Sequence, residues 1–286
     1  MSTIIERLNN TTYVLEELNI ITRDFIVSSP EYRHNLEEIE GMDGVVDLGT
    51  TEGPRRITLE LYFEADEVMK YAEKRDEVFE IFASKEPFYV IDGRSPGKKW
   101  LVKVDRPFAP SQVRKYGLFQ VELIAIKGRA ESIGTSIQAK TFEHLQNLPV
   151  TYTDYQDIYA TKFKIYNPGQ KINPRNPNHY LKITYKGNSE NLRIENKTTG
   201  DVWQYLGTSN LNDEIVIEGI RSTKNGLSIF RDTNKRLITI APGWNEFEIS
   251  GAPDTREYAI QANMPRKKIP AELKKNPLTF EFKFIF

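Results

Sequence analysis

The sequence predicts a mainly β protein with two domains, an N-terminal β domain that contains one helix and a C-terminal β-sandwich. Apolar and polar residues alternate in short segments along much of the chain, which is typical of half-buried strands. One segment, residues 66–83, has helical periodicity instead. The length of 286 residues exceeds the roughly 100 to 200 residues of a usual single domain, so two domains are expected.

The N-terminal domain is expected to span residues 1–140 and to be rich in strands. Its clearest strand is Arg55–Glu64, in which every second residue is apolar. The same alternation returns at residues 100–104 and 119–123. Between these strands, residues 66–83 are expected to form a helix with an apolar stripe toward the core. The stripe consists of Val68, Ala72, Phe79, Phe82 and Ala83. Arg75 within it is expected to reach solvent or to pair with a carboxylate, and an intersubunit contact is the less favoured alternative.

The C-terminal domain is expected to span residues 141–286. Alternation weakens between residues 130 and 161, so we place a connecting segment and the domain boundary there. Beyond it, short strands separated by segments rich in Gly, Asn and Pro predict a sandwich or jelly roll. The expected strands are 163–166, 180–185, 192–195, 202–206, 215–217, 237–240 and 247–249. A charged stretch at residues 265–276 is the next segment of helical length.

The final strand, residues 278–286, is unusually apolar. Its alternate residues, Leu278, Phe280, Phe282, Phe284 and Phe286, would form one face. An unpaired strand of this composition would be prone to aggregation. We therefore expect it to pair with another strand and close a sheet.

Composition argues for protein partners. The 39 Lys and Arg residues nearly balance the 40 Asp and Glu residues, so no broad attraction to nucleic acid is expected. The basic clusters Lys98-Lys99 and 266–268 lack interleaved aromatic residues and are interpreted as solvated loops. No apolar run approaches the roughly 20 residues of a membrane span, and the first residues do not resemble a secretion signal. We expect synthesis in a cytoplasm and no membrane insertion.

No catalytic, cofactor-binding or metal-binding residues are predicted. The chain has no cysteine, and its histidines are His34, His144 and His179, none of them spaced as paired ligands. Phosphate-binding glycine loops and a serine nucleophile motif are missing from the sequence. Adjacent acids such as Glu37 and Glu38 are interpreted as solvated surface. We therefore expect a protein that is not an enzyme.

Two further features bear on binding. Residues 42–49, followed by Gly53 and Pro54, contain turn chemistry and predict a compact turn or a protruding loop. Trp203 and Tyr205 share one strand face and are weak candidates for stacking against a carbohydrate. Burial of both rings is the commoner outcome for large aromatic residues in a sandwich. We therefore expect no measurable affinity of this pair for simple glycans.

Short stretches in order along nearly the whole chain carry a resemblance to a known family. They are RDFIVSSP at 23–30, GMDGVVDLG at 41–49, KEPFYVID at 85–92, GKKWLVKV at 97–104, AESIG at 130–134, YLKITYKG at 180–187 and APGWN at 241–245. In these stretches the chain resembles the distal tail proteins of long-tailed, non-contractile phages (siphophages) that infect Gram-positive bacteria.

The resemblance implies a hub of the phage tail tip or baseplate. The N-terminal domain would assemble into a hexameric ring, and the C-terminal sandwich would resemble galectins and carbohydrate-binding modules. The ring would connect the major tail tube protein to a tail-associated, lysin-like protein, with a receptor-binding protein as a further partner. The protein would then reside in the virion after assembly in the host cytoplasm.

Two other classes of function stay open at this point. A glycan-binding module in the C-terminal sandwich would help the virion attach to the host cell wall. An enzyme acting on that wall is the third hypothesis, and it is disfavoured because no acid and base pair or metal set stands out in the sequence.

Overall fold

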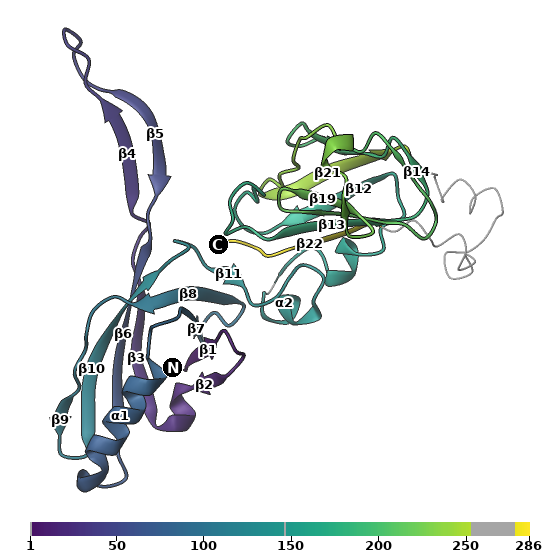
Figure 1. The fold of residues 1–286 in the computed structure, drawn as a ribbon. Coiled ribbons are helices and arrows are strands. Elements are labelled where there is room, and N and C mark those ends of the chain that lie inside the picture. The colour runs from purple at the N-terminus through teal and green to yellow at the C-terminus, as the bar shows by residue number, and fades with distance from the viewer. Residues whose placement is uncertain (1, 146, 253–277) are drawn as a thin grey trace. The chain divides into compact units, whose positions relative to one another are not determined.

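The computed structural model describes residues 2–145, 147–252 and 278–286, and it divides into two compact units (Figure 1). The units are Met1–Glu131 and Ser132–Phe286. The boundary expected after residue 140 therefore falls inside the second unit. The charged stretch at 265–276 and the basic cluster at 266–268 lie outside the described residues.

An antiparallel sheet forms the body of the first unit. Its strands follow the order β2-β1-β7-β8-β10-β6-β3, with β9 paired to β10 and β11 paired to β8. Their bounds are β1 Thr3–Arg7, β2 Thr12–Val14, β3 Ile20–Val27, β6 Arg55–Glu64, β7 Phe88–Asp92, β8 Lys98–Val104, β9 Ser111–Val113, β10 Tyr116–Ala125 and β11 Glu131–Ser132. A 3-10 turn, η1 (Leu15–Leu18), separates β2 from β3.

The pairing of β6 with β10 supplies much of the core of this unit. β6 has the bounds that the alternation predicts, and its apolar face is buried, which confirms that prediction. Leu59 faces Val121 and Leu61 faces Phe119 across the two strands. Gly117 lies opposite Phe63, where an added Cβ would come within 2.4 Å of the ring. Only glycine therefore leaves room for this ring inside the core.

The predicted helix is shorter than expected and buries a different side. A 3-10 turn, η2 (Val68–Lys70), precedes the helix α1 (Tyr71–Ile81). A 3-10 turn advances about 3.0 residues per turn instead of 3.6, so the stripe drawn from Val68 has the wrong phase. The buried residues are Tyr71, Val78, Ile81 and Phe82, whereas Val68 and Phe79 are 54% and 39% exposed. Arg75 pairs with Asp76 at 2.8 Å, as expected.

Lys99 is also placed differently from the expectation. Lys98 and Lys99 begin β8 instead of lying in a solvated loop, and Lys99 is only 6% exposed. Its ammonium lies 2.9 Å from the carboxylate of Glu6 and 4.0 Å from the ring centroid of Tyr89. The ion pair and the cation–π contact compensate for the desolvation of this charge.

The aromatic cluster beneath α1 gives a stability prediction. Phe82 lies 5.7 Å from Phe108 and 6.5 Å from Phe88, and it is 2% exposed. Phe82→Ala should lower the free energy of unfolding by about 3 to 5 kcal/mol, because it opens a cavity in a packed core. Phe79→Ala is the matched control and should cost less than about 2 kcal/mol, since that ring is partly in solvent. Chemical denaturation measures both, and equal losses would contradict the assignment of the buried side.

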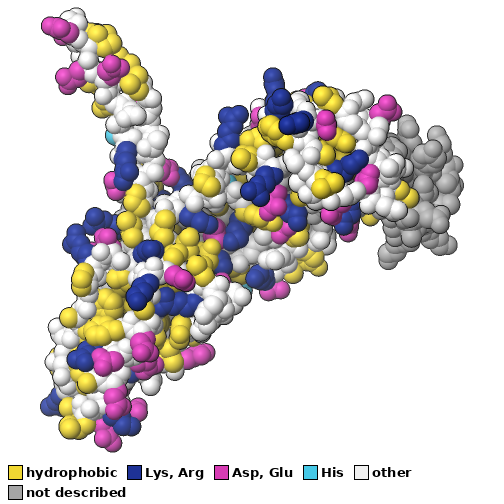
Figure 2. All heavy atoms as spheres, in the orientation of Figure 1, with side chains coloured by type: hydrophobic (Ala, Val, Ile, Leu, Met, Phe, Trp, Pro, Cys, Tyr) yellow, Lys and Arg dark blue, Asp and Glu magenta, His cyan; other side chains and the backbone are white. Residues whose placement is uncertain are grey.

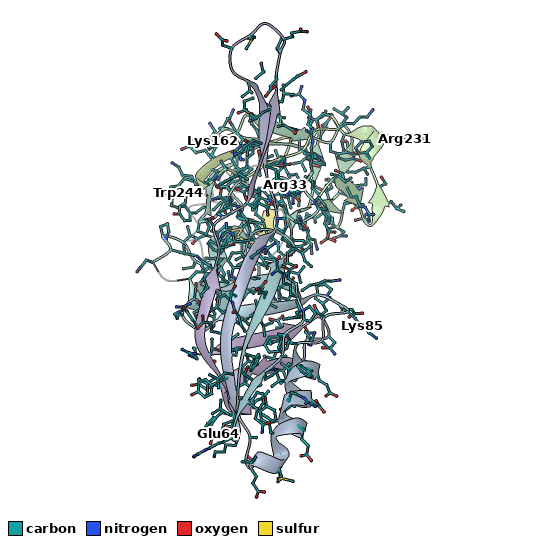
Figure 3. The ribbon with its side chains drawn as sticks, turned by 90° about the vertical axis from the view of Figure 1, so that its left-hand side faces the viewer. Arg33, Glu64, Lys85, Lys162, Arg231 and Trp244 are labelled. Carbon is teal, nitrogen blue, oxygen red and sulfur yellow. The ribbon has the colours of Figure 1, made fainter. Side chains whose placement is uncertain are left out.

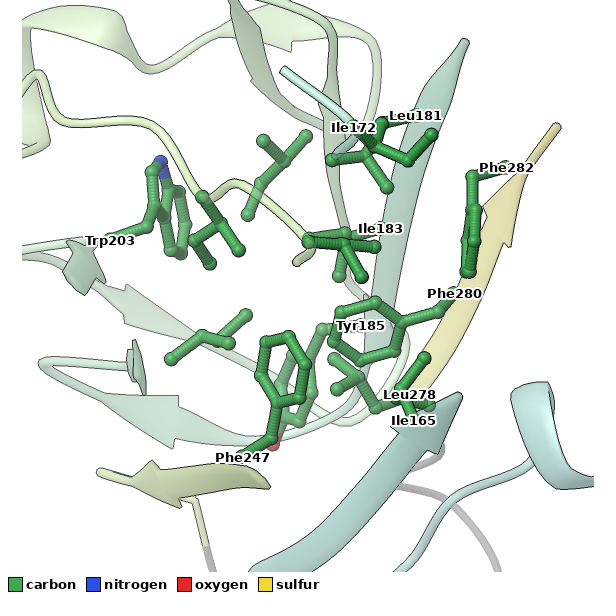
Figure 4. Packing of buried hydrophobic residues seen from close by; sticks show 14 of the residues in the cluster. Ile165, Ile172, Leu181, Ile183, Tyr185, Trp203, Phe247, Leu278, Phe280 and Phe282 are labelled. Carbon is green, nitrogen blue, oxygen red and sulfur yellow. The ribbon is translucent and has the colours of Figure 1, made fainter. Parts of the chain in front are cut away.

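The second unit contains two sheets that enclose a common apolar core (Figure 4). One sheet has the order β12-β21-β15-β16 and the other β20-β19-β18-β13-β22, while β14 and β17 form a separate pair. The strand bounds are β12 Lys162–Asn167, β13 Leu181–Lys186, β14 Ser189–Glu190, β15 Arg193–Asn196, β16 Asp201–Gln204, β17 Thr208–Ser209, β18 Glu214–Glu218, β19 Arg221–Lys224, β20 Leu227–Ser228, β21 Gly243–Ser250 and β22 Leu278–Phe282. The short helical elements are α2 Ala139–His144, η3 Tyr152–Tyr155 and η4 Phe230–Asp232.

Most of the strands expected in this unit are present. The exception is the segment 237–240, which makes only an isolated bridge between Ile172 and Ile240. The strand β19 is not predicted, because all four of its residues are polar and no apolar residue alternates with them. Ser222 within it is nevertheless buried. Its hydroxyl accepts a hydrogen bond from Trp203 Nε1 at 3.1 Å. The fold is mainly β, as predicted.

The apolar last strand, β22, is held on both edges. On one edge it pairs with β13, where Phe280 faces Ile183. On the other edge, the segment from Ser132 to Ile158 donates to it: Ser136 N bonds to Phe282 O at 2.8 Å, and Ile158 N bonds to Leu278 O at 2.9 Å. The boundary between the units, after Glu131, lies at the start of the expected connecting segment 130–161, and the rest of that segment belongs to the second unit and is bound to β22. The polar residues of this segment are held by hydrogen bonds and not by burial of apolar surface. The periodicity of apolar residues therefore gives no sign of them.

Ser136 offers a test of this edge. Its side chain is fully buried, donates to Phe280 O at 2.8 Å and accepts from Phe282 N at 3.1 Å. Ser136→Ala should lower the free energy of unfolding of the second unit by about 1 to 3 kcal/mol, because it leaves buried backbone groups without this partner. Thr153→Ala, on an exposed site in the same segment, is the control. Equal unfolding midpoints for both variants would show that the serine does not hold the strand.

Candidate functional site

A two-stranded hairpin projects from the sheet of the first unit between β3 and β6 (Figure 1). Its strands are β4 (Tyr32–Glu37) and β5 (Val46–Glu52), and we call residues 31–52 the arm. The strands pair from Tyr32 with Glu52 to Glu37 with Val46. Residues 42–49, expected as a turn or protruding loop, form the tip and the first part of β5.

The arm bends and is anchored at defined positions. The register shifts between Asn35 and Leu36, opposite Gly49, whose φ of +118° suits glycine. At the base, Gly53 N donates to Glu31 O at 2.8 Å. Arg129 Nε also donates to the Glu52 carboxylate at 2.7 Å. These contacts fix where the arm leaves the sheet.

The surface of the arm combines exposed apolar side chains with a strong negative charge (Figure 2). The exposed apolar residues are Tyr32, Leu36, Ile39, Met42, Val45 and Leu48, the last of them 61% exposed. Seven acidic residues and one basic residue, Arg33 (Figure 3), give residues 31–52 a formal charge of −6 from 1 − 7. A lone two-stranded hairpin is marginally stable in water. The arm therefore has few apolar contacts of its own to stabilise it.

Two features bear on metal or ligand binding in the described part of the chain. Within it, no three His, Cys, Asp or Glu side chains are grouped so that they would hold a metal ion. A pocket of about 350 Å³ beside η2 and α1 is lined mainly by acidic and lysine side chains. Some of these charges are already paired, as Lys74 with Glu77 at 2.8 Å. No helix of the described residues is long and apolar enough to cross a membrane.

The carbohydrate candidates from the sequence lie inside the second unit. Trp203 is 1% exposed and Tyr205 6% exposed, and both belong to the apolar core between the two sheets. Figure 4 shows Trp203 among the core side chains. Neither ring presents a face to solvent, so this pair does not form a stacking surface.

A second aromatic pair lies on the surface of the same unit. The sequence analysis did not predict it, because its two residues lie on different strands. Tyr166 on β12 faces Trp244 on β21 in the paired register, with ring centroids 5.1 Å apart and planes at 58°. Trp244 is 45% exposed, and Figure 3 shows it at the rim of the unit. The two residues are far apart in sequence. Only the pairing of β12 with β21 brings them together.

Ion pairs continue from this aromatic pair along the same sheet face. Lys164 lies 2.7 Å from Glu246, and Lys162 lies 3.3 Å from Glu248. Lys197 lies 3.0 Å from Glu248 as well. Hydrogen bonding from Lys164 lowers the pKa of Glu246, and hydrogen bonds from Lys197 and Lys162 lower the pKa of Glu248. Both carboxylates therefore stay charged and act as hydrogen-bond acceptors.

Comparisons with known proteins agree with the resemblance noted in the sequence. Residues 8–125 match the model of the phage tail protein RIFT-related domain. The structure resembles the Dit (gp 19.1) protein of phage SPP1, which is described as a paradigm of the hub adsorption apparatus in phages that infect Gram-positive bacteria. That likeness has a TM-score of 0.62 at 7% identity and covers 99% of each chain.

A weaker likeness links the chain to the baseplate of phage p2 in its activated conformation with Ca. Its TM-score is 0.45 at 10% identity, over 99% of this chain and 97% of the other. A search of curated proteins finds no match to the sequence. Residues 8–125 thus match a phage tail domain model, and the chain has a fold similar to that of the SPP1 Dit protein.

Proposed function

We propose that this protein is a structural hub of a siphophage tail tip or baseplate, where six copies form a closed ring. The observation that carries the proposal is the likeness to the SPP1 Dit protein, a hub component, over 99% of both chains. The tail-domain match in the first unit supports the same role. The protein is then a component of the virion tail, assembled in the host cytoplasm, and acts through its surfaces and not through chemistry.

The arm supports the ring on physical grounds. A closed ring needs two different, complementary surfaces on each subunit, so that one subunit contacts the next head to tail. The arm projects from the sheet of the first unit and has exposed apolar side chains. Its one basic and seven acidic residues give residues 31–52 a formal charge of −6. The proposal therefore requires a partner surface with apolar and basic side chains on a neighbouring copy. Apolar burial supplies the affinity of such a contact, and charge directs its orientation.

The hub connects proteins of different kinds. One face of the ring contacts the major tail tube protein, and the opposite face contacts a tail-associated, lysin-like protein. A receptor-binding protein is a further partner. The balanced formal net charge of −1 for the whole chain is consistent with protein partners.

Electron microscopy of the purified full chain tests the ring directly, and arm variants test its cause. Class averages should show six-fold rings, alone or with the tail tube protein added. Leu48→Gln, which removes an apolar side chain that is 61% exposed, should weaken association by about tenfold or more if that side chain is buried between copies. Light scattering over a concentration series measures the shift.

Leu227→Gln is the matched control, because Leu227 is 76% exposed and lies in the second unit. It should leave association unchanged. A full chain that stays monomeric at every concentration, also with the tail tube protein, would refute the ring. If both leucine variants changed association equally, the arm would not be part of the contact between copies.

The proposal that the chain is not an enzyme has its own test. Purified protein spotted on host cell walls embedded in agar should leave no cleared zone, whereas a lytic tail protein from the same virion serves as the positive control. Clearing by the purified chain would revive the hypothesis of a wall-degrading enzyme.

A further inference from the structure

The base of the arm contains a half-buried arginine that has no ion-pair partner among the described residues. Arg55 opens β6 on the same strand face as the buried Ile57. Its guanidinium carbon lies 5.3 Å from the ring centroid of Trp100, and its Nε is buried without a hydrogen-bond partner. Removing a charge from water is costly unless the charge is paired. The cation–π contact with Trp100 compensates for only part of this cost.

The arginines beside Arg55 are already paired. Arg129 donates to the Glu52 carboxylate through two nitrogens, one of them at 2.7 Å. Arg33 lies 3.5 Å from Glu31. The pKa of Arg55 is lowered, first by burial and then by the charge of Arg129. We call Arg33, Arg55 and Arg129 the arginine cluster. Its three positive charges exceed the two negative charges of Glu31 and Glu52, which leaves a charge of +1 from 3 − 2.

Close backbone packing holds the arginine cluster in place. A Cβ added to Gly128 would lie 2.7 Å from Gly53 O, and one added to Gly53 would lie 3.2 Å from Arg33 Nε. The chain segments that carry Arg55 and Arg129 therefore touch through glycine backbone. A site that is preorganised in this way loses less conformational freedom when it binds.

The outer part of the arm has the opposite charge. Residues 34–51, which we call the distal arm, contain five acidic residues and no lysine or arginine, so their formal charge is −5 from 0 − 5. None of the ion pairs among the described residues includes one of these acids. The acids are Glu37, Glu38, Glu40, Asp43 and Asp47.

The paired strands of the arm keep these acids away from the arginine cluster of the same copy. Glu37 is the first of them along the arm and lies five residues beyond Tyr32, or about 16 Å along the strand at 3.3 Å per residue. Pairing of β4 with β5 prevents the arm from folding back on its base. A distal-arm carboxylate can therefore reach Arg55 only from another molecule.

We propose that Arg55 is a carboxylate-binding site and that its ligand is a carboxylate from the distal arm of a second copy. The carboxylate meets the terminal nitrogens of Arg55, since Nε is buried. A planar guanidinium binds a carboxylate through two parallel hydrogen bonds. The inference rests on the proposed ring and names the basic side chain that the arm meets. A base at one end of the arm and acids at the other give the head-to-tail contact that a closed ring requires.

The charges of the site favour a single carboxylate over a polyanion. A phosphate polymer such as nucleic acid is bound by several cations that are available at once. In the arginine cluster, Arg33 and Arg129 already have carboxylate partners, so one positive charge is left over. A carboxylate from a different protein would have the same chemistry as one from the arm, and the variants below separate these two sources.

Light scattering of the full chain over a concentration series, alone and with the tail tube protein, tests the proposal. Arg55→Met keeps an apolar stem on Trp100 but removes the charge, and it should weaken association by about tenfold or more. Arg55→Lys keeps the charge without the planar fork and should recover part of the loss. Arg175→Met, on an exposed site in the second unit, is the matched control and should leave association unchanged.

Chemical denaturation of the monomer separates binding from a structural role. Arg55→Met should leave the unfolding midpoint unchanged or raise it, because Arg55 has no ion-pair partner within the described part of its own copy. Arg129→Met should lower the midpoint, because Glu52 then loses its partner. A midpoint that falls equally in both variants would make Arg55 a structural residue and would overturn the proposal.

A double-mutant cycle identifies the source of the carboxylate. The amide-arm variant replaces all five acids of the distal arm: Glu37→Gln, Glu38→Gln, Glu40→Gln, Asp43→Asn and Asp47→Asn. Adding Arg55→Met to it should weaken association no further, since either change alone removes the pair. Losses that add together would assign the carboxylate to another source and would overturn the proposal.

The unaltered chain reports on the ring, and the Arg55 variants report on the site. Rings of the unaltered chain in electron micrographs, together with unchanged association of Arg55→Met, would overturn this inference and leave the hub role intact. An unaltered chain that stays monomeric, also with the tail tube protein, would refute the ring and this contact with it.

Discussion

The second unit depends on how the edges of its last strand are paired. β22 is apolar on its inner face, and an unpaired edge would expose backbone donors and acceptors beside three fully buried side chains, Leu278, Phe280 and Phe282. The chain satisfies one edge with β13 and the other with the segment that opens the unit. Ser132 and Ser136 contribute hydroxyl groups there in addition to backbone groups. Both pairings together leave neither edge of this strand open.

Apolar periodicity predicts the parts of this fold that are held by side-chain area. Arg55–Glu64 has the predicted bounds because Ile57, Leu59 and Leu61 each meet an apolar side chain across β10, and Phe63 packs over Gly117. The sandwich follows from its recurring short strands in the same way. Periodicity fails where hydrogen bonds or a change of helical pitch decide the structure. The segment after Ser132 and the phase of α1 after η2 are the two examples.

The candidate surfaces show a similar division. Turn residues at 42–49 predict a turn or protruding loop, and the arm protrudes there. Its length could not be predicted, because it depends on the pairing of β4 with β5. For aromatic pairs, neighbours along one strand are visible in the sequence, as Trp203 and Tyr205 are. Neighbours across two strands are not, because the register of β12 with β21 is a tertiary property. The sequence does contain one indication that Trp244 is exposed. Successive side chains of a strand point to opposite faces, so Trp244 points outward if its neighbour Asn245 is buried.

The position of β22 in the sequence also sets an order of events during synthesis. The strands of the first unit's sheet all lie within residues 3–132, so the sheet has every strand as soon as that stretch has left the ribosome. The sandwich, by contrast, joins Ser136 to Phe282 and Leu181 to Phe282 across long stretches of chain. Such non-local pairing is slow, because the loop entropy is lost before the contacts form. The first unit can therefore fold while the sandwich still lacks its last strand. During that interval the incomplete apolar core of the sandwich is open to aggregation and to chaperone binding.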